Sequence, residues 1–149
     1  MKIYLDTNIV MDVLVGPSME NYQYSIRILD AIKKTPELSG LFSVQSLTDI
    51  AYTQTKFGPE NRKRFYEEAK ELLGIVNLVT IKPVSSEEAI RAVPADFEDH
   101  EQILCAEDNE CSWFITGDRR LLENYRNLPG RIPVASPKEF IGMASQEKE

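Results

Sequence analysis

Hydrophobic residues along the chain form two kinds of pattern, short continuous runs and longer stretches with helical spacing. The runs predict strands buried on both faces, and the spaced stretches predict helices with one apolar face. The predicted strands are residues 2–5, 40–44, 76–81, 112–116 and 132–136. The predicted helices are residues 9–14, 24–32, 46–56, 59–74, 85–93, 96–109 and 119–125, with a last helix from Pro137.

Local signals mark several of the predicted helix ends. Pro36 ends the second helix, because proline disfavours a helical conformation in the residue before it. The fourth helix has Pro59 near its start and Gly74 at the position expected for a C-cap. Ser85 and Glu88 have the spacing of a capping box, which predicts that the fifth helix opens at Ser85.

The alternation of strands and helices predicts the fold class. Parallel strands need crossover connections of a dozen or more residues, which helices provide. We therefore expect an α/β fold with three α/β/α layers and a central parallel sheet of about five strands. No repeat or linker divides the sequence, so residues 1–144 are expected to form one domain, followed by a polar tail at 145–149.

The composition is typical of a soluble globular protein, with 149 residues of which 42% are hydrophobic and 28% charged. The apolar run at the start is interrupted by Asp6 and Asp12, and no apolar stretch reaches the roughly 20 residues of a membrane-spanning helix. We expect a cytoplasmic protein with no membrane partner. In that compartment Cys105 and Cys111 are expected to be reduced, half-buried thiols.

The chain is acidic, with a net charge of −7. This balance argues against tight, non-specific binding of nucleic acid by a basic surface. The densest basic run, residues 62–64, lies in a stretch of mixed charge that is typical of a solvated helix.

Four carboxylates are expected at one edge of the sheet, where ligands bind in open α/β folds. Asp6 directly follows the first strand, and Asp118 follows the fourth strand with Gly117 between them. Asp99 lies in the first turn of the sixth helix, and Asp49 lies on the helix after the second strand. Each could instead have a structural role, as an N-cap, a charge that favours a helix start, or a solvated surface residue.

Convergence of these four residues predicts a cation, because carboxylates held together repel one another. Carboxylate oxygens suit Mg²⁺ or Mn²⁺, and Mg²⁺ is commonly shared with substrate phosphates. The expected substrate is therefore a phosphate ester.

Four sequence blocks resemble those of the PIN-domain family, compact metal-dependent ribonucleases that include VapC-type toxins. The blocks are "YLDTNIVMDVL", "SLTDIAYTQ", "DFEDHEQILCA" and "FITGD", in that order along nearly the whole chain. The resemblance implies hydrolysis of RNA with one or two Mg²⁺ or Mn²⁺ ions. It also implies an antitoxin over the cleft and a homodimer, although no residue pattern identifies either partner.

The resemblance assigns roles to residues one by one. The four catalytic acids correspond to Asp6, Asp49, Asp99 and Asp118, with Asp96 as an additional metal ligand; Thr7, Asn8 and Thr116 correspond to supporting polar residues. Two positions depart from the pattern. Asp49 stands where relatives usually have glutamate, so it would reach metal only through water, and Gly117 stands where relatives often have arginine. Arg119 or Arg120 would then contact the RNA phosphates.

Other interpretations remain open. The only histidine, His100, is expected on the helix surface and not in catalysis, since it points about 100° around the helix from Asp99. A dehalogenase-type phosphatase would carry Asp-x-Asp-x-Thr, which the sequence after Asp6 lacks. A phosphoacceptor receiver would need an acidic pair after its first strand. A PIN-like module that binds RNA or protein without cutting is the alternative from another class.

Overall fold

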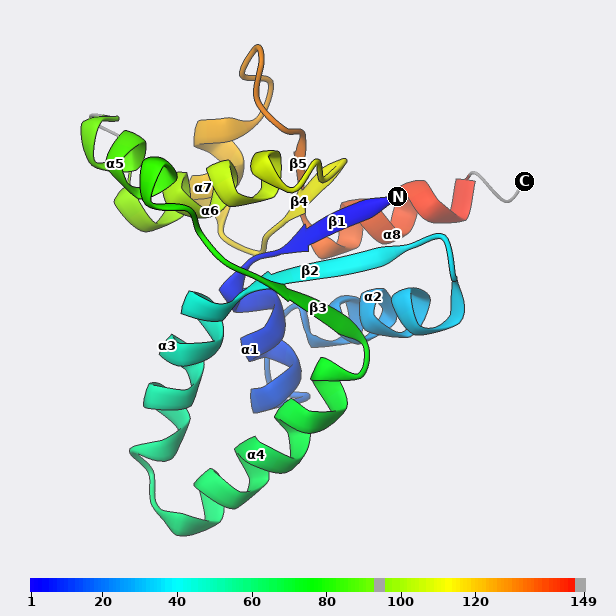
Figure 1. The fold of residues 1–149 in the computed structure, drawn as a ribbon. Coiled ribbons are helices and arrows are strands. Elements are labelled where there is room, and N and C mark those ends of the chain that lie inside the picture. Colours follow the sequence, from blue (N-terminus) through cyan, green and yellow to red (C-terminus); the bar gives the residue numbers. More distant parts are fainter. Residues whose placement is uncertain (93–95, 147–149) are drawn as a thin grey trace.

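The computed structural model describes residues 1–92 and 96–146, which form a five-stranded parallel sheet in the order β3-β2-β1-β4-β5 (Figure 1). The fold confirms the predicted class. Its strands are β1 (Lys2–Leu5), β2 (Ser39–Ser43), β3 (Val76–Val79), β4 (Trp113–Ile115) and β5 (Val134–Ala135). Its helices are α1 (Thr7–Val15), α2 (Tyr22–Lys34), α3 (Val44–Thr55), α4 (Pro59–Leu73), α5 (Pro83–Arg91), α6 (Phe97–Asp108), α7 (Arg119–Tyr125) and α8 (Pro137–Gln146).

The first strand lies at the centre of the sheet, although it comes first in the chain. Ile3 is in register with Gly40 of β2 on one side and with Trp113 of β4 on the other. Because all neighbours run parallel, the carboxyl ends of β1, β2 and β4 meet at one edge. Residues that directly follow these strands are therefore brought together.

The two faces of the sheet bury different residues, as strand alternation requires. Ile3 and Leu5 belong to the larger core cluster, to which α1, α2, α3, α4 and α8 contribute. Tyr4, between them, points to the opposite face and packs with residues of α6 and α7. Figure 1 shows α5, α6 and α7 gathered on one side of the sheet, with α1, α2 and α8 on the other.

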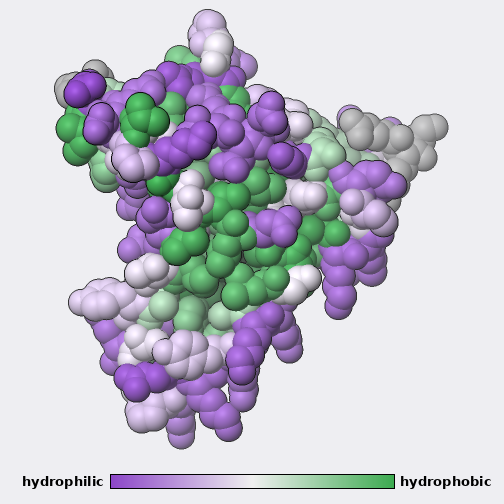
Figure 2. All heavy atoms as spheres, viewed as in Figure 1, coloured by the Kyte–Doolittle hydropathy of each residue, from purple (hydrophilic) through white to green (hydrophobic). Residues whose placement is uncertain are grey.

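Helices α3 and α4 form a hairpin that extends away from the sheet (Figure 1). A groove of about 560 Å³ lies between them and is lined by apolar residues including Leu47, Phe65 and Leu73. Figure 2 shows hydrophobic side chains gathered over this part of the surface. None of the helices in the described ranges has both the length and the apolar character needed to cross a bilayer.

The predicted opening of the fifth helix at Ser85 is wrong. Helix α5 begins at Pro83, and Ser85 is buried with its hydroxyl donating to Asp108 Oδ2 over 2.8 Å. Its side chain therefore joins α5 to α6 instead of capping a helix start. The predicted end of this helix at Val93 and residues 147–149 of the predicted tail lie outside the described residues.

Candidate active site

Asp6 lies where the central strand becomes a helix. Its backbone amide donates to the Ile115 carbonyl over 2.9 Å, which extends the pairing of β1 with β4 by one residue. The side chain is 4% exposed and accepts from the Thr7 amide at 2.7 Å, so Asp6 is also the N-cap of α1. Burial raises the pKa of this carboxyl, although its hydrogen bonds act in the opposite direction.

Asn8 and Thr116 hold the second oxygen of Asp6. The Thr116 hydroxyl donates to Asp6 Oδ2 over 2.7 Å, and Asn8 Nδ2 donates to the same oxygen over 2.9 Å. Thr116 Oγ1 also accepts from the Asp118 amide, and Asn8 Oδ1 accepts from the Gly117 amide. These bonds fasten the end of β1 to the turn that follows β4, which fixes Asp6 relative to Asp118.

Asp118 and Asp96 each begin a helix. Asp118 Oδ1 accepts from the amides of Arg120 and Leu121, and Asp96 Oδ1 accepts from the Asp99 amide over 3.1 Å. The capping roles that the sequence left open are therefore present at these positions. In each case one carboxylate oxygen makes the cap, and a cap bond does not prevent the other oxygen from binding a ligand.

Asp99 interacts electrostatically with these carboxylates. It is half-buried in the first turn of α6, and burial is the main reason that the pKa of its carboxyl rises to about 7. The negative charges of Asp96, Asp6 and Asp118 raise this pKa further. Segments far apart in the sequence thus place their carboxylates within one another's electrostatic field.

Asp49 is exposed on α3. Burial is the main reason that the pKa of Glu98, in the first turn of α6, is raised, and the charge of Asp49 raises it further. Glu98, which is also exposed, feels the charges of Asp6 and Asp96 as well. Sequence reasoning missed Glu98, although its position beside Asp99 in the acidic start of α6 was the available signal.

A buried polar network connects the segments that carry the carboxylates. Gln102, one turn after Asp99 on α6, is 3% exposed and contacts Ser46 Oγ at 3.3 Å. Ser46 accepts from the Thr7 hydroxyl over 2.7 Å, and Tyr4 donates to Gln102 over 3.5 Å. The network joins α6 to the ends of β1 and β2. It was not predicted, because nothing local distinguishes Gln102 from a surface glutamine.

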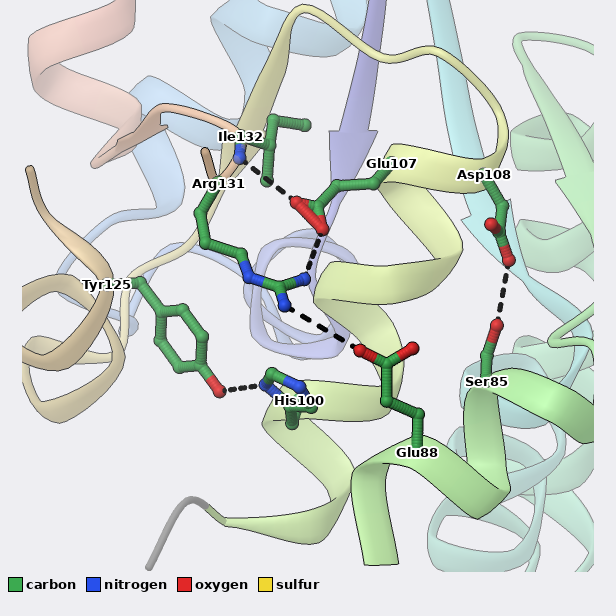
Figure 3. Close-up of polar contacts among 8 residues, drawn as sticks. All are labelled: Ser85, Glu88, His100, Glu107, Asp108, Tyr125, Arg131 and Ile132. Atoms are coloured by element: carbon green, nitrogen blue, oxygen red, sulfur yellow. Dashed lines mark hydrogen bonds and ion pairs between the residues drawn. The ribbon is translucent and has the colours of Figure 1, made fainter. Parts of the chain in front are cut away.

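His100 is buried, and the prediction of a surface position is wrong. Its Nδ1 lies 2.7 Å from the Tyr125 hydroxyl, and the two rings stack with centroids 5.9 Å apart (Figure 3). Helix α7 covers the side of α6 that the helical angle alone left open to solvent. Burial and the nearby charge of Arg131 lower the pKa of this imidazole.

Arg131 fastens the same region. Its guanidinium binds Glu107 of α6 at 2.6 Å and Glu88 of α5 at 3.7 Å (Figure 3). Glu107 also accepts from the Ile132 amide over 3.2 Å. These contacts hold α6, and with it Asp99, at a set position beside the sheet.

The donor set suits a hard divalent cation, since every candidate ligand is a carboxylate oxygen. Among residues 1–92 and 96–146, however, no three His, Cys, Asp or Glu side chains are close enough to coordinate one ion. Both oxygens of Asp6 accept hydrogen bonds from residues of its own chain, Thr7, Asn8 and Thr116. The two cysteines are free, Cys105 buried and Cys111 half-buried.

The two arginines proposed for RNA are exposed at the start of α7. Arg119 lies 3.5 Å from Glu20 of the loop between α1 and α2, and the exposure of both side chains makes this ion pair weak. The backbone amide of Arg120, in the first turn of α7, donates to Asp118 Oδ1 over 2.8 Å.

A family model described as the PIN domain matches residues 2–120. No curated protein matches the sequence.

Several solved structures share the fold at low sequence identity. VapBC2 from Rickettsia felis, bound to a DNA fragment from its promoter, aligns over 91% of this chain and 98% of its own, with 12% identity and a TM-score of 0.64. VapBC-1 from nontypeable Haemophilus influenzae aligns over 93% and 99%, with 14% identity and a TM-score of 0.65. VapC20 from Mycobacterium tuberculosis, described as a toxin that cleaves the sarcin–ricin loop, aligns over 87% and 98%, with 14% identity and a TM-score of 0.63.

Proposed function

This chain belongs to the PIN-domain family, and from that premise we propose that it is an endoribonuclease that hydrolyses RNA with Mg²⁺ or Mn²⁺. The observation that carries the proposal is the position of Thr116, which donates to Asp6 and accepts from the Asp118 amide and so holds both aspartates at the edge where β1 and β4 end. Burial and the charges of Asp96, Asp6 and Asp118 raise the pKa of Asp99 at the same edge. Like charges held there cost free energy that a bound cation would offset. The description of the M. tuberculosis neighbour as an RNA-cleaving toxin supports the substrate class.

Three carboxylates would hold the ion, namely Asp6, Asp99 and Asp118. Asp96 is a further candidate ligand, and Asp49 would act through water. When bound, Mg²⁺ or Mn²⁺ lowers the pKa of a water molecule and offsets negative charge on phosphate oxygens.

The chain's own residues prepare the site for hydrolysis, in which water attacks phosphorus in line with the departing 3′-oxygen. Thr116 and Asn8 orient Asp6 through hydrogen bonds to its Oδ2. The hydrogen bonds among Gln102, Ser46 and Thr7 connect α6 to the same edge of the sheet. Arg119 and Arg120 would contact RNA phosphates from the first turn of α7.

Cleavage of RNA in the presence and absence of metal tests the proposal. Purified protein is incubated with structured and unstructured RNAs in Mg²⁺ or Mn²⁺, beside Asp6→Asn and Asp99→Asn variants and an Asp30→Asn control on the exposed face of α2. Wild type and control are expected to cut, and both site variants to lose cleavage. Cleavage that persists in both site variants or in excess chelator would refute the proposal.

A second candidate is a module that binds RNA or protein without cutting. Two observations favour it: both Asp6 oxygens accept hydrogen bonds from Thr7, Asn8 and Thr116, and no three candidate ligands lie close enough to hold one ion in the described part of the chain. Failure to bind Mn²⁺ at saturating concentration would select this function over the nuclease.

An antitoxin partner is also proposed, since several structural neighbours are toxin–antitoxin complexes. The apolar groove between α3 and α4 is a surface that such a partner could cover. Co-purification of this chain with the product of an adjacent gene, and loss of RNA cleavage in that complex, is the expected result.

A further inference from the structure

Asn21 has the position of a helix cap but does not act as one. Asparagine is favoured at the N-cap because its side-chain oxygen can accept from an amide of the first turn. Here the residue has φ −95° and ψ 2°, and its side chain makes no capping hydrogen bond to α2. Of the side-chain hydrogen bonds among residues 1–92 and 96–146, none involves the Asn21 amide, which is half-exposed.

The side-chain amide group of Asn21 lies against Gly117, at the turn between β4 and α7. A β-carbon at position 117 would stand only 2.9 Å from Asn21 Nδ2 and 3.3 Å from Asn8 Oδ1. Both separations are too short for an ordinary contact, so the Asn21 side chain occupies the space that a side chain at 117 would need.

Direct contacts connect this place to the buried carboxylate. The Gly117 amide donates to Asn8 Oδ1 over 2.8 Å, and Asn8 Nδ2 donates to Asp6 Oδ2 over 2.9 Å. Gly117 is also the residue between Thr116, which binds Asp6, and Asp118. The Asn21 amide therefore borders the carboxylate site on the side of α1 and α2.

The loop that carries Asn21 has a defined conformation. Gly16 begins it at φ +111°, a backbone angle that other residues rarely adopt. Two successive turns follow, in which the Met19 amide donates to Gly16 and the Tyr22 amide donates to Met19, each over 3.1 Å. Glu20 lies 3.5 Å from Arg119, and the next residue, Asn21, lies against Gly117. Two adjacent residues of the loop therefore contact the segment at the start of α7.

We propose that Asn21 is an RNA-contacting residue that reads a base beside the scissile phosphate from the position left open by Gly117. The proposal rests on the proposed ribonuclease function. A side-chain amide offers one acceptor and two donors without charge, which match the edge of a base, whereas phosphate is matched best by the charged fork of arginine. Sequence-specific RNA recognition depends on such contacts to unstacked bases.

The test uses short single-stranded RNA of randomised sequence, with Mn²⁺, and sequencing of the cut ends. Asn21→Ala is expected to weaken the base preference at one position beside the cut. On an RNA that wild type cuts well, KM should rise about three- to tenfold while kcat stays within about twofold, as expected for one lost hydrogen bond in binding. Asn21→Asp, which keeps the shape and loses the donors, should have an effect at least as large.

A double-mutant cycle tests the role of Gly117. Gly117→Ala is expected to displace the Asn21 amide and so to give the same change in preference as Asn21→Ala. The base preference of the double variant should then be no weaker than that of either single variant. Asn61→Ala on α4 is the matched control and should behave as wild type, since the Asn61 side chain donates to the carbonyl of Phe57, just before that helix.

Unchanged preference and KM in both Asn21 variants would overturn the proposal, and so would effects of Asn21→Ala and Gly117→Ala on base preference that multiply. Binding of the same RNA in excess chelator, followed by fluorescence anisotropy, separates this outcome from failure of the nuclease function. If wild type binds but never cuts, weaker binding by Asn21→Ala still supports the contact and equal binding refutes it. If wild type neither binds nor cuts, both proposals are refuted.

Discussion

Thr116 donates its hydroxyl proton to Asp6 over 2.7 Å, so the residue after β4 holds the carboxylate that ends β1. The two residues are 110 positions apart in the chain, and both side chains are almost fully buried. Their contact joins the two halves of the candidate site.

Replacement of Thr116 by valine, which has the same shape, removes this bond. We expect Thr116→Val to lower the free energy of unfolding by about 1–3 kcal/mol, since a buried carboxylate loses a donor. Thr116→Ser keeps the hydroxyl and should recover most of this loss. Urea denaturation measures both variants, and equal stability of the two would contradict the role of the hydroxyl.

The raised pKa of Asp99 predicts how the stability of the metal-free protein depends on pH. Its folded-state pKa of about 7 lies above the ordinary value of 3.8. Between these values the folded state binds more protons than the unfolded chain, so this carboxyl lowers stability as pH rises through that window. Asp99→Asn removes the effect.

In excess chelator we therefore expect Asp99→Asn to be more stable than wild type near neutral pH, and the difference to vanish as the pH approaches about 4. Thermal unfolding of both proteins across this range measures the difference. A gap that stays constant with pH would show that Asp99 does not titrate as the structure indicates.

The buried pair of His100 and Tyr125 gives a test of packing between α6 and α7. Tyr125→Phe leaves His100 Nδ1 without its partner at 2.7 Å, and should cost about 1–3 kcal/mol of stability. Tyr66→Phe, at an exposed position on α4, is the matched control and should change stability by less than about 0.5 kcal/mol. Similar losses in both variants would contradict a specific role for the Tyr125 hydroxyl.

Structural features that arise from residues close together in the chain can be predicted from the sequence, whereas features that arise from contacts between distant segments cannot. The five strands and the start of α7 at Arg119 follow from local apolar runs and from a capping aspartate, and the structure has them close to the predicted positions. Asp6 and Asp118 could be placed at one edge because parallel strands end on the same side.

The remaining features depend on which helices pack together. His100 was predicted to be exposed because the angle around α6 does not reveal that α7 covers it. Ser85 matched a capping motif, yet its hydroxyl binds Asp108, 23 positions away. The place of Asn21 against Gly117 likewise arises from a loop whose path no local pattern specifies.

Gly40 in β2 tests the tight packing of the sheet against α2. A β-carbon there would approach Ile32 Cδ1 to 2.6 Å and Val76 Cγ1 to 3.2 Å, so Gly40→Ala should cost about 1–3 kcal/mol by overpacking. Gly142 in α8 has open space around it, and Gly142→Ala should stabilise by about 0.5–1 kcal/mol. Chemical denaturation of the two variants should give changes of opposite sign, and a neutral Gly40→Ala would contradict the packing.

The central claim is that carboxylates from separate segments form one metal-dependent RNA-cleaving site. The most direct measurement is the initial rate of RNA cleavage as Mn²⁺ is titrated into chelator-treated protein, for wild type and for Asp99→Asn. We expect no cleavage without metal, a rate that saturates with Mn²⁺ in wild type, and a loss of at least about a hundredfold in the variant at every concentration. A rate that is independent of Mn²⁺, or equal in the two proteins, would contradict it.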